Sequence, residues 1–159
     1  DENYKNYSVS NKGNVKNNNT QRILKPSLNV NGYLCVTLMN SGERKNFKIH
    51  KLVINAFVEN TFNKKYVDHK DRNKQNNDVS NLRWASASEN CQNKNKRQNT
   101  TSKYYGVYYN KNNANWRSSI KVNGKKINIG SFKNEIDAAI AYDDMIKKHD
   151  LSFCVLNFG

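Results

Sequence analysis

An aspartate and a histidine stand side by side at Asp68 and His69, and two asparagines, Asn81 and Asn90, follow further along the chain. Carboxylate and amide oxygens are hard donors of the kind that Mg²⁺ accepts, and an imidazole exchanges a proton near neutral pH. Such residue types can together hydrolyse a phosphodiester, which needs an activated water, a neutralised phosphate and a stabilised leaving oxygen. Taken singly, each also fits a polar turn or the neighbour of a helix cap in this asparagine-rich chain.

The elements that must position these residues are short. Tyr66–His69 predicts a strand, the asparagine-rich stretch 72–80 a loop, and Leu82–Ala85 the return strand. Ser86 and Glu89 then form a capping box, in which the hydroxyl accepts from the N3 amide while the carboxylate reaches back to the first amide. This box predicts a helix with Asn90 in its first turn.

The run Tyr66-Val67-Asp68-His69, followed by Asn81-Leu82-Arg83-Trp84 and Asn90, resembles the HNH endonucleases, and closely their phage homing and nicking branch. The resemblance covers roughly residues 50–90 and implies a ββα-metal fold. It implies that Asp68 and Asn90 hold one divalent ion, Mg²⁺ with Mn²⁺ as the alternative, leaving about four octahedral positions for phosphate and water. It also implies that His69 is the general base and that Asn81 braces the loop and orients the histidine through backbone hydrogen bonds.

Regular strand geometry places Asp68 and His69 on opposite faces, because side chains alternate along a strand. Both residues can surround one phosphate only if the backbone is irregular where the strand meets the loop. We therefore expect a local break at His69.

The region before the site predicts a β-hairpin module. Apolar and small residues alternate from Gly32 to Asn40, Ser41-Gly42 turns the chain, and Asn46–Ile49 returns before a helix at 51–58. A short strand is expected at Tyr7–Val9. Residues 1–58 loosely resemble the nuclease-associated module found ahead of HNH sites, and we expect a hairpin that supports the catalytic fold. His50 is expected to be a buried or capping residue.

The C-terminal part predicts three strands, at Tyr105–Tyr109, Asn115–Val122 and Lys125–Phe132, followed by a helix at Glu135–His149. Residues 103–133 contain seven Lys or Arg and no acid, whereas 134–159 contain two basic and five acidic residues. Alternation places Arg117, Ser119 and Lys121 on one face, and Trp116, Ser118, Ile120 and Val122 on the other. We expect the second face to pack on Ile136, Ala139 and Ile140, and the basic face to meet DNA.

This part resembles the plant ethylene-response-factor (APETALA-type) DNA-binding domain in Tyr104-Tyr105-Gly106-Val107, Ile129-Gly130-Ser131-Phe132 and Ala141-Tyr142-Asp143. Tyr105 and Tyr108 stand where the plant domains usually carry arginines, so the plant target sequence does not transfer. Arg117 fits guanine recognition and phosphate binding equally well. The expected DNA-binding residues are Arg83, Lys94, Lys96, Arg97, Tyr105, Tyr108, Arg117, Ser119, Lys121, Lys126 and Asn128.

Composition points to an acidic polymer as partner, since the formal charge is +14 and the isoelectric point about 9.7. A membrane surface is disfavoured because no apolar run approaches ~18 residues. The three cysteines form no CxxC pair, so neither a disulfide framework nor a structural zinc site is expected. A cytoplasmic, non-secreted protein of a bacterium or of a phage-infected cell fits best.

The sequence thus predicts an α+β chain with a hairpin module and HNH domain at 1–90, a basic linker at 91–102 and a three-stranded antiparallel sheet packed on one helix at 103–159. The implied function is cleavage of double-stranded DNA at a site located by the C-terminal module, without a small-molecule cofactor and with a monomer favoured. A catalytically inactive DNA-binding regulator is the alternative. An RNA or membrane-surface binder would rest on charge alone.

Overall fold

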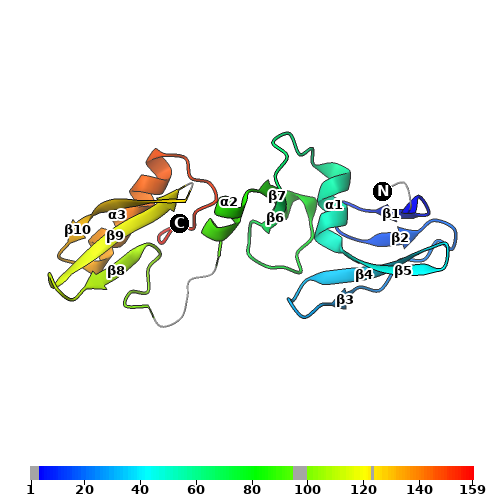
Figure 1. Ribbon diagram of the computed structural model, residues 1–159, viewed down its shortest axis with the longest axis horizontal. Coiled ribbons are helices and arrows are strands. Elements are labelled where there is room, and N and C mark those ends of the chain that lie inside the picture. Colours follow the sequence, from blue (N-terminus) through cyan, green and yellow to red (C-terminus); the bar gives the residue numbers. More distant parts are fainter. Residues whose placement is uncertain (1–3, 95–99, 123) are drawn as a thin grey trace. The chain divides into compact units, whose positions relative to one another are not determined.

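The computed structural model describes residues 4–94, 100–122 and 124–159, and its contacts divide the chain into two compact units, Asp1–Ser86 and Ala87–Gly159 (Figure 1). The α+β class is confirmed, with several small antiparallel sheets. The division falls inside the segment predicted as one nuclease domain. The predicted boundaries at residues 90 and 103 remain predictions.

The first unit is built from three small sheets and one main helix. Its elements are β1 (Tyr7–Val9) paired with β2 (Val15–Asn17), the sheet β3 (Ser27–Leu28), β4 (Leu34–Asn40) and β5 (Glu43–Lys48), helix α1 (Ile49–Phe57), and the pair β6 (Tyr66–His69) and β7 (Leu82–Ala85), with the 3-10 turn η2 (Val79–Asn81) before β7. The two predicted strands of the candidate site have the observed bounds. The helix predicted at 51–58 starts earlier, at Ile49.

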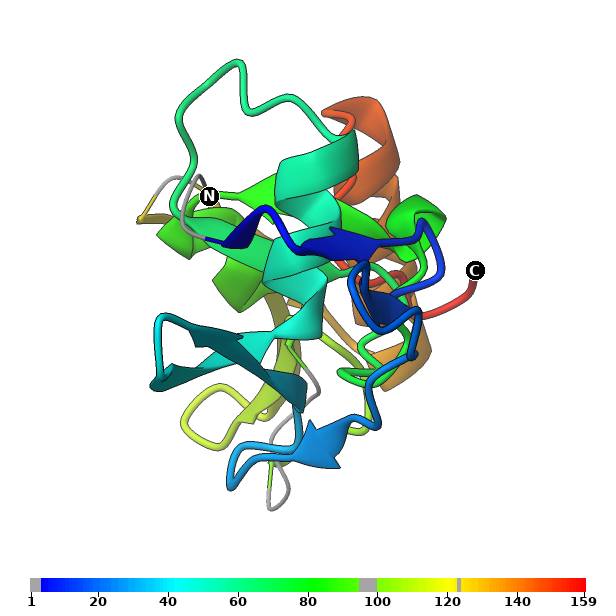
Figure 2. The same ribbon diagram turned by 90° about the vertical axis from the view of Figure 1, so that its right-hand side faces the viewer.

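One hydrophobic core joins these sheets. Helix α1 contacts β1, β4, β5, β6 and β7 (Figures 1 and 2). Val53 and Ile54 of the helix are fully buried against Val36 and Leu38 of β4 and Leu82 of β7. Because β7 is part of this core, the strand pair of the candidate site is fixed to the N-terminal module. The expectation of a supporting hairpin agrees with this packing.

The second unit holds helix α2 (Ala87–Gln92), a sheet in the order β10-β9-β8, and helix α3 (Glu135–Lys148). The strands are β8 (Val107–Asn110), β9 (Asn115–Val122) and β10 (Lys125–Phe132), all antiparallel, and α3 packs on the sheet. The prediction of three strands and one helix is confirmed. The first strand begins at Val107 and not at Tyr105.

The face of α3 that meets the sheet differs from the prediction. Ile136 and Ile140 are 54% and 46% exposed, so their predicted packing is wrong, whereas Ala139 is buried as predicted, together with Ala138 and Tyr142. The close approach of Tyr142 to the backbone of Gly106 explains why this face of α3 meets the sheet. A Cβ on Gly106 would lie 2.2 Å from the ring of Tyr142. Small alanines and one flat ring allow the helix to lie against the strands.

A buried carboxylate ties the C-terminal segment to this unit. Asp143 is 3% exposed and accepts hydrogen bonds from the backbone N–H groups of Asn157, at 2.9 Å, and Phe158, at 2.8 Å. The side chain of Asn157 in turn accepts from the backbone N–H of Tyr105 at 2.6 Å. The chain end is therefore held beside the start of the sheet by charge-assisted hydrogen bonds.

Candidate active site

The strand pair β6–β7 presents Asp68 and His69 in regular register. Asp68 pairs with Arg83 and His69 with Leu82, and the ladder continues without a shift to the end of β6. The predicted break at His69 is therefore wrong, because antiparallel pairing with β7 holds both residues in the pleat. Their side chains leave the strand on opposite faces.

Asp68 carries a charge partner on the neighbouring strand. Its carboxylate Oδ2 accepts from Nε of Arg83 at 2.8 Å, and the whole residue is only 6% exposed. The cross-strand register places these two side chains opposite one another, which is the geometry in which opposite charges stabilise a sheet. Arg83 thus lies at the site, as expected, with its Nε bound to the carboxylate.

His69 is buried, at 5% exposure, and its ring contacts three side chains from distant parts of the first unit. Its Nε2 lies 3.3 Å from Oδ1 of Asn77 in the loop between β6 and β7. The ring of His50, from α1, meets it edge to face with centroids 5.1 Å apart, and the ring of Tyr33 lies 6.0 Å away. Lys74 lies over the Tyr33 ring, with its Nζ 4.9 Å from the ring centre.

Burial lowers the pKa of His69 below its ordinary value, and the charge of Lys74 adds to this effect. The hydrogen bond to Asn77 and the negative charges of Asp71 and Asp68 oppose it without reversing it. Burial also lowers the pKa of His50, to about 3, with contributions from His69, Lys48 and Lys51. Both imidazoles are therefore neutral at physiological pH, the state in which a histidine can accept a proton.

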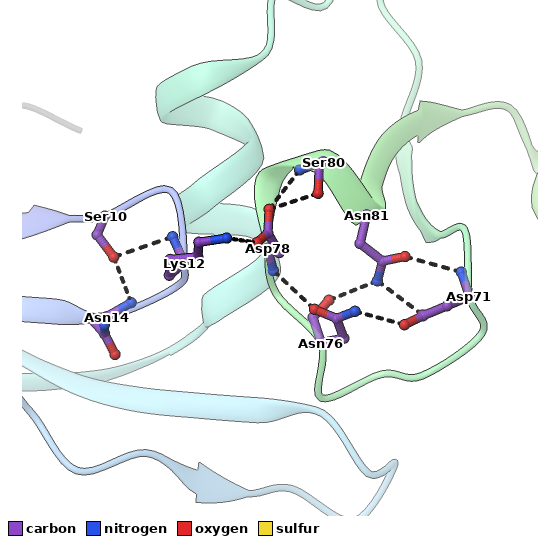
Figure 3. A network of polar contacts seen from close by, with 8 residues as sticks. All are labelled: Ser10, Lys12, Asn14, Asp71, Asn76, Asp78, Ser80 and Asn81. Atoms are coloured by element: carbon purple, nitrogen blue, oxygen red, sulfur yellow. Dashed lines mark hydrogen bonds and ion pairs between the residues drawn. The ribbon is translucent and has the colours of Figure 1, made fainter.

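The loop after β6 is braced by Asn81 (Figure 3). Nδ2 of Asn81 donates to Asp71 Oδ1 and to the carbonyl of Asn76, both at 2.9 Å, and its Oδ1 accepts from the N–H of Asp71 at 3.0 Å. Its backbone carbonyl accepts from the N–H of Lys70 at 2.8 Å. Burial raises the pKa of Asp71, but hydrogen bonds from Asn76, Asn73 and Asn81 outweigh it and leave that pKa lowered. This is the bracing that was expected of Asn81, and its catalytic importance remains a proposal.

The far side of the same loop is attached to the turn between β1 and β2 (Figure 3). Lys12 forms an ion pair with Asp78, whose carboxylate also accepts from the N–H and hydroxyl of Ser80. These bonds lower the pKa of Asp78 to about 2. The backbone N–H of Val79 donates to the carbonyl of Asn11 at 2.8 Å. The N-terminal module is therefore in direct contact with the loop that follows the candidate general base.

The residues predicted as metal ligands fall in different units. Asp68 belongs to the first, and Asn90 is a half-buried residue of α2 in the second. Their donor atoms, a carboxylate and an amide oxygen, are the hard ligands that Mg²⁺ or Mn²⁺ prefers, so the chemistry of the pair fits such an ion. Among the residues that the structure describes, no three or more His, Cys, Asp or Glu side chains gather as a metal site.

The sheet of the second unit brings most of the predicted DNA-binding residues onto one face. Cross-strand pairs join Tyr108 to Arg117, Ser119 to Asn128 and Lys121 to Lys126. Nζ of Lys126 also lies 4.9 Å from the centre of the Tyr108 ring. A bulge between Asn128 and Gly130 interrupts the pairing beyond them.

Four further residues of the chain were predicted to bind DNA, namely Tyr105, Lys94, Lys96 and Arg97. Tyr105 packs against the cluster of Ile120, Tyr142 and Ile146, and its predicted part in DNA binding stays a prediction. Lys94 is exposed after α2. Lys96 and Arg97 lie outside the described residues.

Sequence reasoning missed Tyr33 and Asn77 as neighbours of His69 and gave His50 only a structural role. The buried state of His50 was expected, at 4% exposure, but its contact with His69 was not. Asn77 is one of several asparagines in its loop, and nothing local distinguishes it. Within the described segments, no helix is both long and apolar enough to cross a membrane.

Comparison with known proteins places two motifs in the first 92 residues. Residues 2–39 match the NUMOD4 motif, and residues 61–92 match the HNH endonuclease family. The chain is 38% identical over 89 residues to an uncharacterized HNH endonuclease of Acanthamoeba polyphaga mimivirus, covering 56% of this chain and 27% of that protein. A second uncharacterized HNH endonuclease of the same virus is 46% identical over 94 residues, covering 57% and 23%.

The DNA endonuclease I-HmuI of Bacillus phage SP01 is 39% identical over 87 residues, covering 55% of this chain and 50% of that protein. The solved structure described as DNA binding and cleavage by the HNH homing endonuclease I-HmuI matches with a TM-score of 0.53 and 38% identity, covering 56% of this chain and 51% of that one. This chain therefore spans about a quarter to about half of the length of these relatives. It carries an HNH endonuclease segment preceded by a NUMOD4 motif and is related to a phage homing endonuclease.

Proposed function

We propose that this chain, in which an HNH endonuclease segment follows a NUMOD4 motif, is a homing-type endonuclease that hydrolyses phosphodiester bonds of double-stranded DNA. His69 is the general base that takes a proton from the attacking water. Asp68 and Asn90 hold one divalent ion, Mg²⁺ or Mn²⁺, which when bound neutralises the scissile phosphate. Because Asp68 and His69 leave a regular strand on opposite faces, this assignment requires the phosphate to lie at the end of β6, where the strand stops at His69 and the chain turns. Asn81 keeps the loop behind His69 in place.

The observation that carries this proposal is that His69 is buried and that burial lowers its pKa. Burying a histidine costs stability unless hydrogen bonds or charges offset the lost hydration. His69 is buried, follows the buried Asp68 in sequence, and belongs to the segment that matches the HNH family. Its lowered pKa keeps the ring neutral and able to accept a proton at pH 7. Perturbed titratable groups of this kind concentrate at functional sites.

The second unit is proposed to hold the DNA duplex through the basic face of its sheet, in the manner of an APETALA-type domain. Tyr108, Arg117, Ser119, Lys121, Lys126 and Asn128 share that face, and residues 103–133 carry no acid to oppose a phosphate backbone. Exposed Lys121 and Lys126 are suited to phosphates. Arg83, Lys94, Lys96 and Arg97 are proposed as further contacts with DNA.

The deciding experiment is cleavage of supercoiled plasmid by the wild-type protein, His69→Ala and His149→Ala, with Mg²⁺ or with EDTA. His149 is exposed at the end of α3 and serves as the matched control. We expect the wild type and His149→Ala to cut with Mg²⁺, and His69→Ala to lose ~10²-fold or more of the rate. Equal cutting by all three proteins, or cutting that survives EDTA, contradicts the assigned chemistry.

A DNA-binding regulator without catalysis is the second candidate, and the Arg83–Asp68 ion pair is the observation that favours it. A guanidinium bound to this carboxylate competes with a metal ion for the same oxygen. If DNA is bound tightly but neither Mg²⁺ nor Mn²⁺ supports cutting, the regulator is correct. Cutting that depends on His69 excludes it.

A further inference from the structure

We propose that Asn77 is a positioning residue that fixes the ring of His69 with its hydrogen on Nε2, so that Nδ1 is the nitrogen that accepts the proton, and that the β1–β2 turn holds Asn77 in place. The proposal rests on the proposed nuclease function of His69. It assigns to the NUMOD4 segment a part in the active site itself.

The contact between Asn77 and His69 has the required chemistry. The carboxamide oxygen Oδ1 lies 3.3 Å from Nε2, and both residues are buried, at 5% exposure each. An amide oxygen can only accept a hydrogen bond, so this contact requires the hydrogen to be on Nε2. A neutral imidazole carries one ring hydrogen, which leaves the lone pair on Nδ1.

The rings around His69 prevent it from turning away from this partner. His50 meets it edge to face at 5.1 Å, and Tyr33 lies over both histidines, at 4.8 Å from His50 and 6.0 Å from His69. Among the residues that the structure describes, Nδ1 of His50 finds no hydrogen-bond partner although it is buried. Because an unpaired buried polar atom costs stability, a leucine or phenylalanine would serve better if this position were only packing. The aromatic enclosure of His69 therefore orients the ring as well as burying it.

The backbone of Gly13, in the turn that connects β1 and β2, packs closely against Asn77. A Cβ on Gly13 would lie 3.0 Å from Cβ of Asn77 and 3.1 Å from Cγ2 of Ile49, so a glycine is needed for this approach. The backbone of the same turn accepts from Val79, and Lys12 pairs with Asp78, two and one residues beyond Asn77. A displacement of the turn would be transmitted to Asn77 and then to His69.

The hydrogen position can be measured without cleavage, from the ¹⁵N resonances of the His69 ring at about pH 8, where an ordinary imidazole is neutral. The resonances are identified by their loss in His69→Ala. We expect Nε2 to have the shift of a protonated ring nitrogen and Nδ1 that of an unprotonated one. Asn77→Leu should mix or invert the two forms, and Asn77→Asp, which keeps an acceptor, should preserve them.

Cleavage kinetics provide the second readout. Asn77→Leu should lower kcat by roughly 10- to 100-fold with little change in KM for DNA, and Asn77→Asp should restore most of the loss. Gly13→Ala should lower kcat by roughly tenfold through displacement of Asn77. Gly42→Ala is the matched control, because Gly42 has nearly the same φ, +85° against +82°, but nothing within 4 Å of an added Cβ.

The proposal is overturned by an Nδ1–H form in the wild type, by an unchanged hydrogen position in Asn77→Leu, or by Asn77→Asp behaving as Asn77→Leu does. Equal slowing by Gly42→Ala and Gly13→Ala refutes the part assigned to the turn. If the protein does not cut DNA at all, the ring resonances still decide the orientation. Absence of cutting would refute the proposed function. The ¹⁵N resonances would then still test whether Asn77 fixes the ring of His69.

Discussion

The buried, neutral His50 should make the first unit sensitive to acid well above the pH at which carboxylates titrate. Burial holds the pKa of His50 at about 3, whereas an unfolded chain would have a value near 6.5. Between these two values the unfolded state binds a proton that the folded state does not, so stability falls as pH decreases through 6.5. From pH 7 to pH 4.5 this histidine alone should cost about 2.5 kcal/mol.

The assay is urea unfolding followed by the fluorescence of Trp84 in a Trp116→Phe background, so that only the first unit is observed. The chain has two tryptophans, and Trp84 packs against the core of this unit with its Nε1 donating to Val58. The unfolding free energy is compared at pH 7 and pH 4.5. His69, whose pKa is also lowered by burial, adds to the loss in the same direction.

The control is His50→Leu, which removes the titrating group while keeping an apolar side chain against the core. It also removes the buried Nδ1, which has no hydrogen-bond partner within the described part of the chain. At pH 7 we expect this variant to be as stable as the wild type or more so. Its loss of stability between pH 7 and pH 4.5 should be smaller by about 2.5 kcal/mol. The same acid sensitivity in both proteins would refute the assignment of this effect to His50.

Three further outcomes are expected. Cutting should continue as pH falls through 6.5, because burial lowers the pKa of His69 and so preserves its proton-accepting form; a rate that halves at or above pH 6.5 would contradict this. Asp143→Ala should destabilise the second unit by ~2–4 kcal/mol, measured by fluorescence of Trp116, since it removes the buried carboxylate that accepts from the N–H groups of Asn157 and Phe158, while exposed Asp144→Ala should change little. Lys121→Ala should reduce the salt dependence of duplex binding by about one phosphate contact, and Lys148→Ala on α3 should not; equal effects would mean that the sheet face is not the DNA surface.

The sequence by itself determined the local elements. Tyr66–His69 and Leu82–Ala85 have the bounds predicted from their composition. The three C-terminal strands and their helix begin and end within two residues of the bounds that alternation and helical signals predicted. These features depend on neighbours two to four residues away, which the sequence displays directly. The residues of the candidate site, Asp68, His69, Asn81 and Asn90, were selected through the resemblance of their segment to the HNH endonucleases, and their roles stay predictions.

Tertiary structure decided what surrounds those residues. The ladder through His69 stayed regular because β7 pairs with it, and the ring then met His50, Tyr33 and Asn77, which come from separate segments. The face of α3 was decided likewise, by the close approach of Tyr142 to Gly106. No local pattern encodes such contacts, because they depend on which segments the core brings together. The sequence therefore identifies the histidine, and the packing of the first unit determines its hydrogen position, its pKa and its orientation.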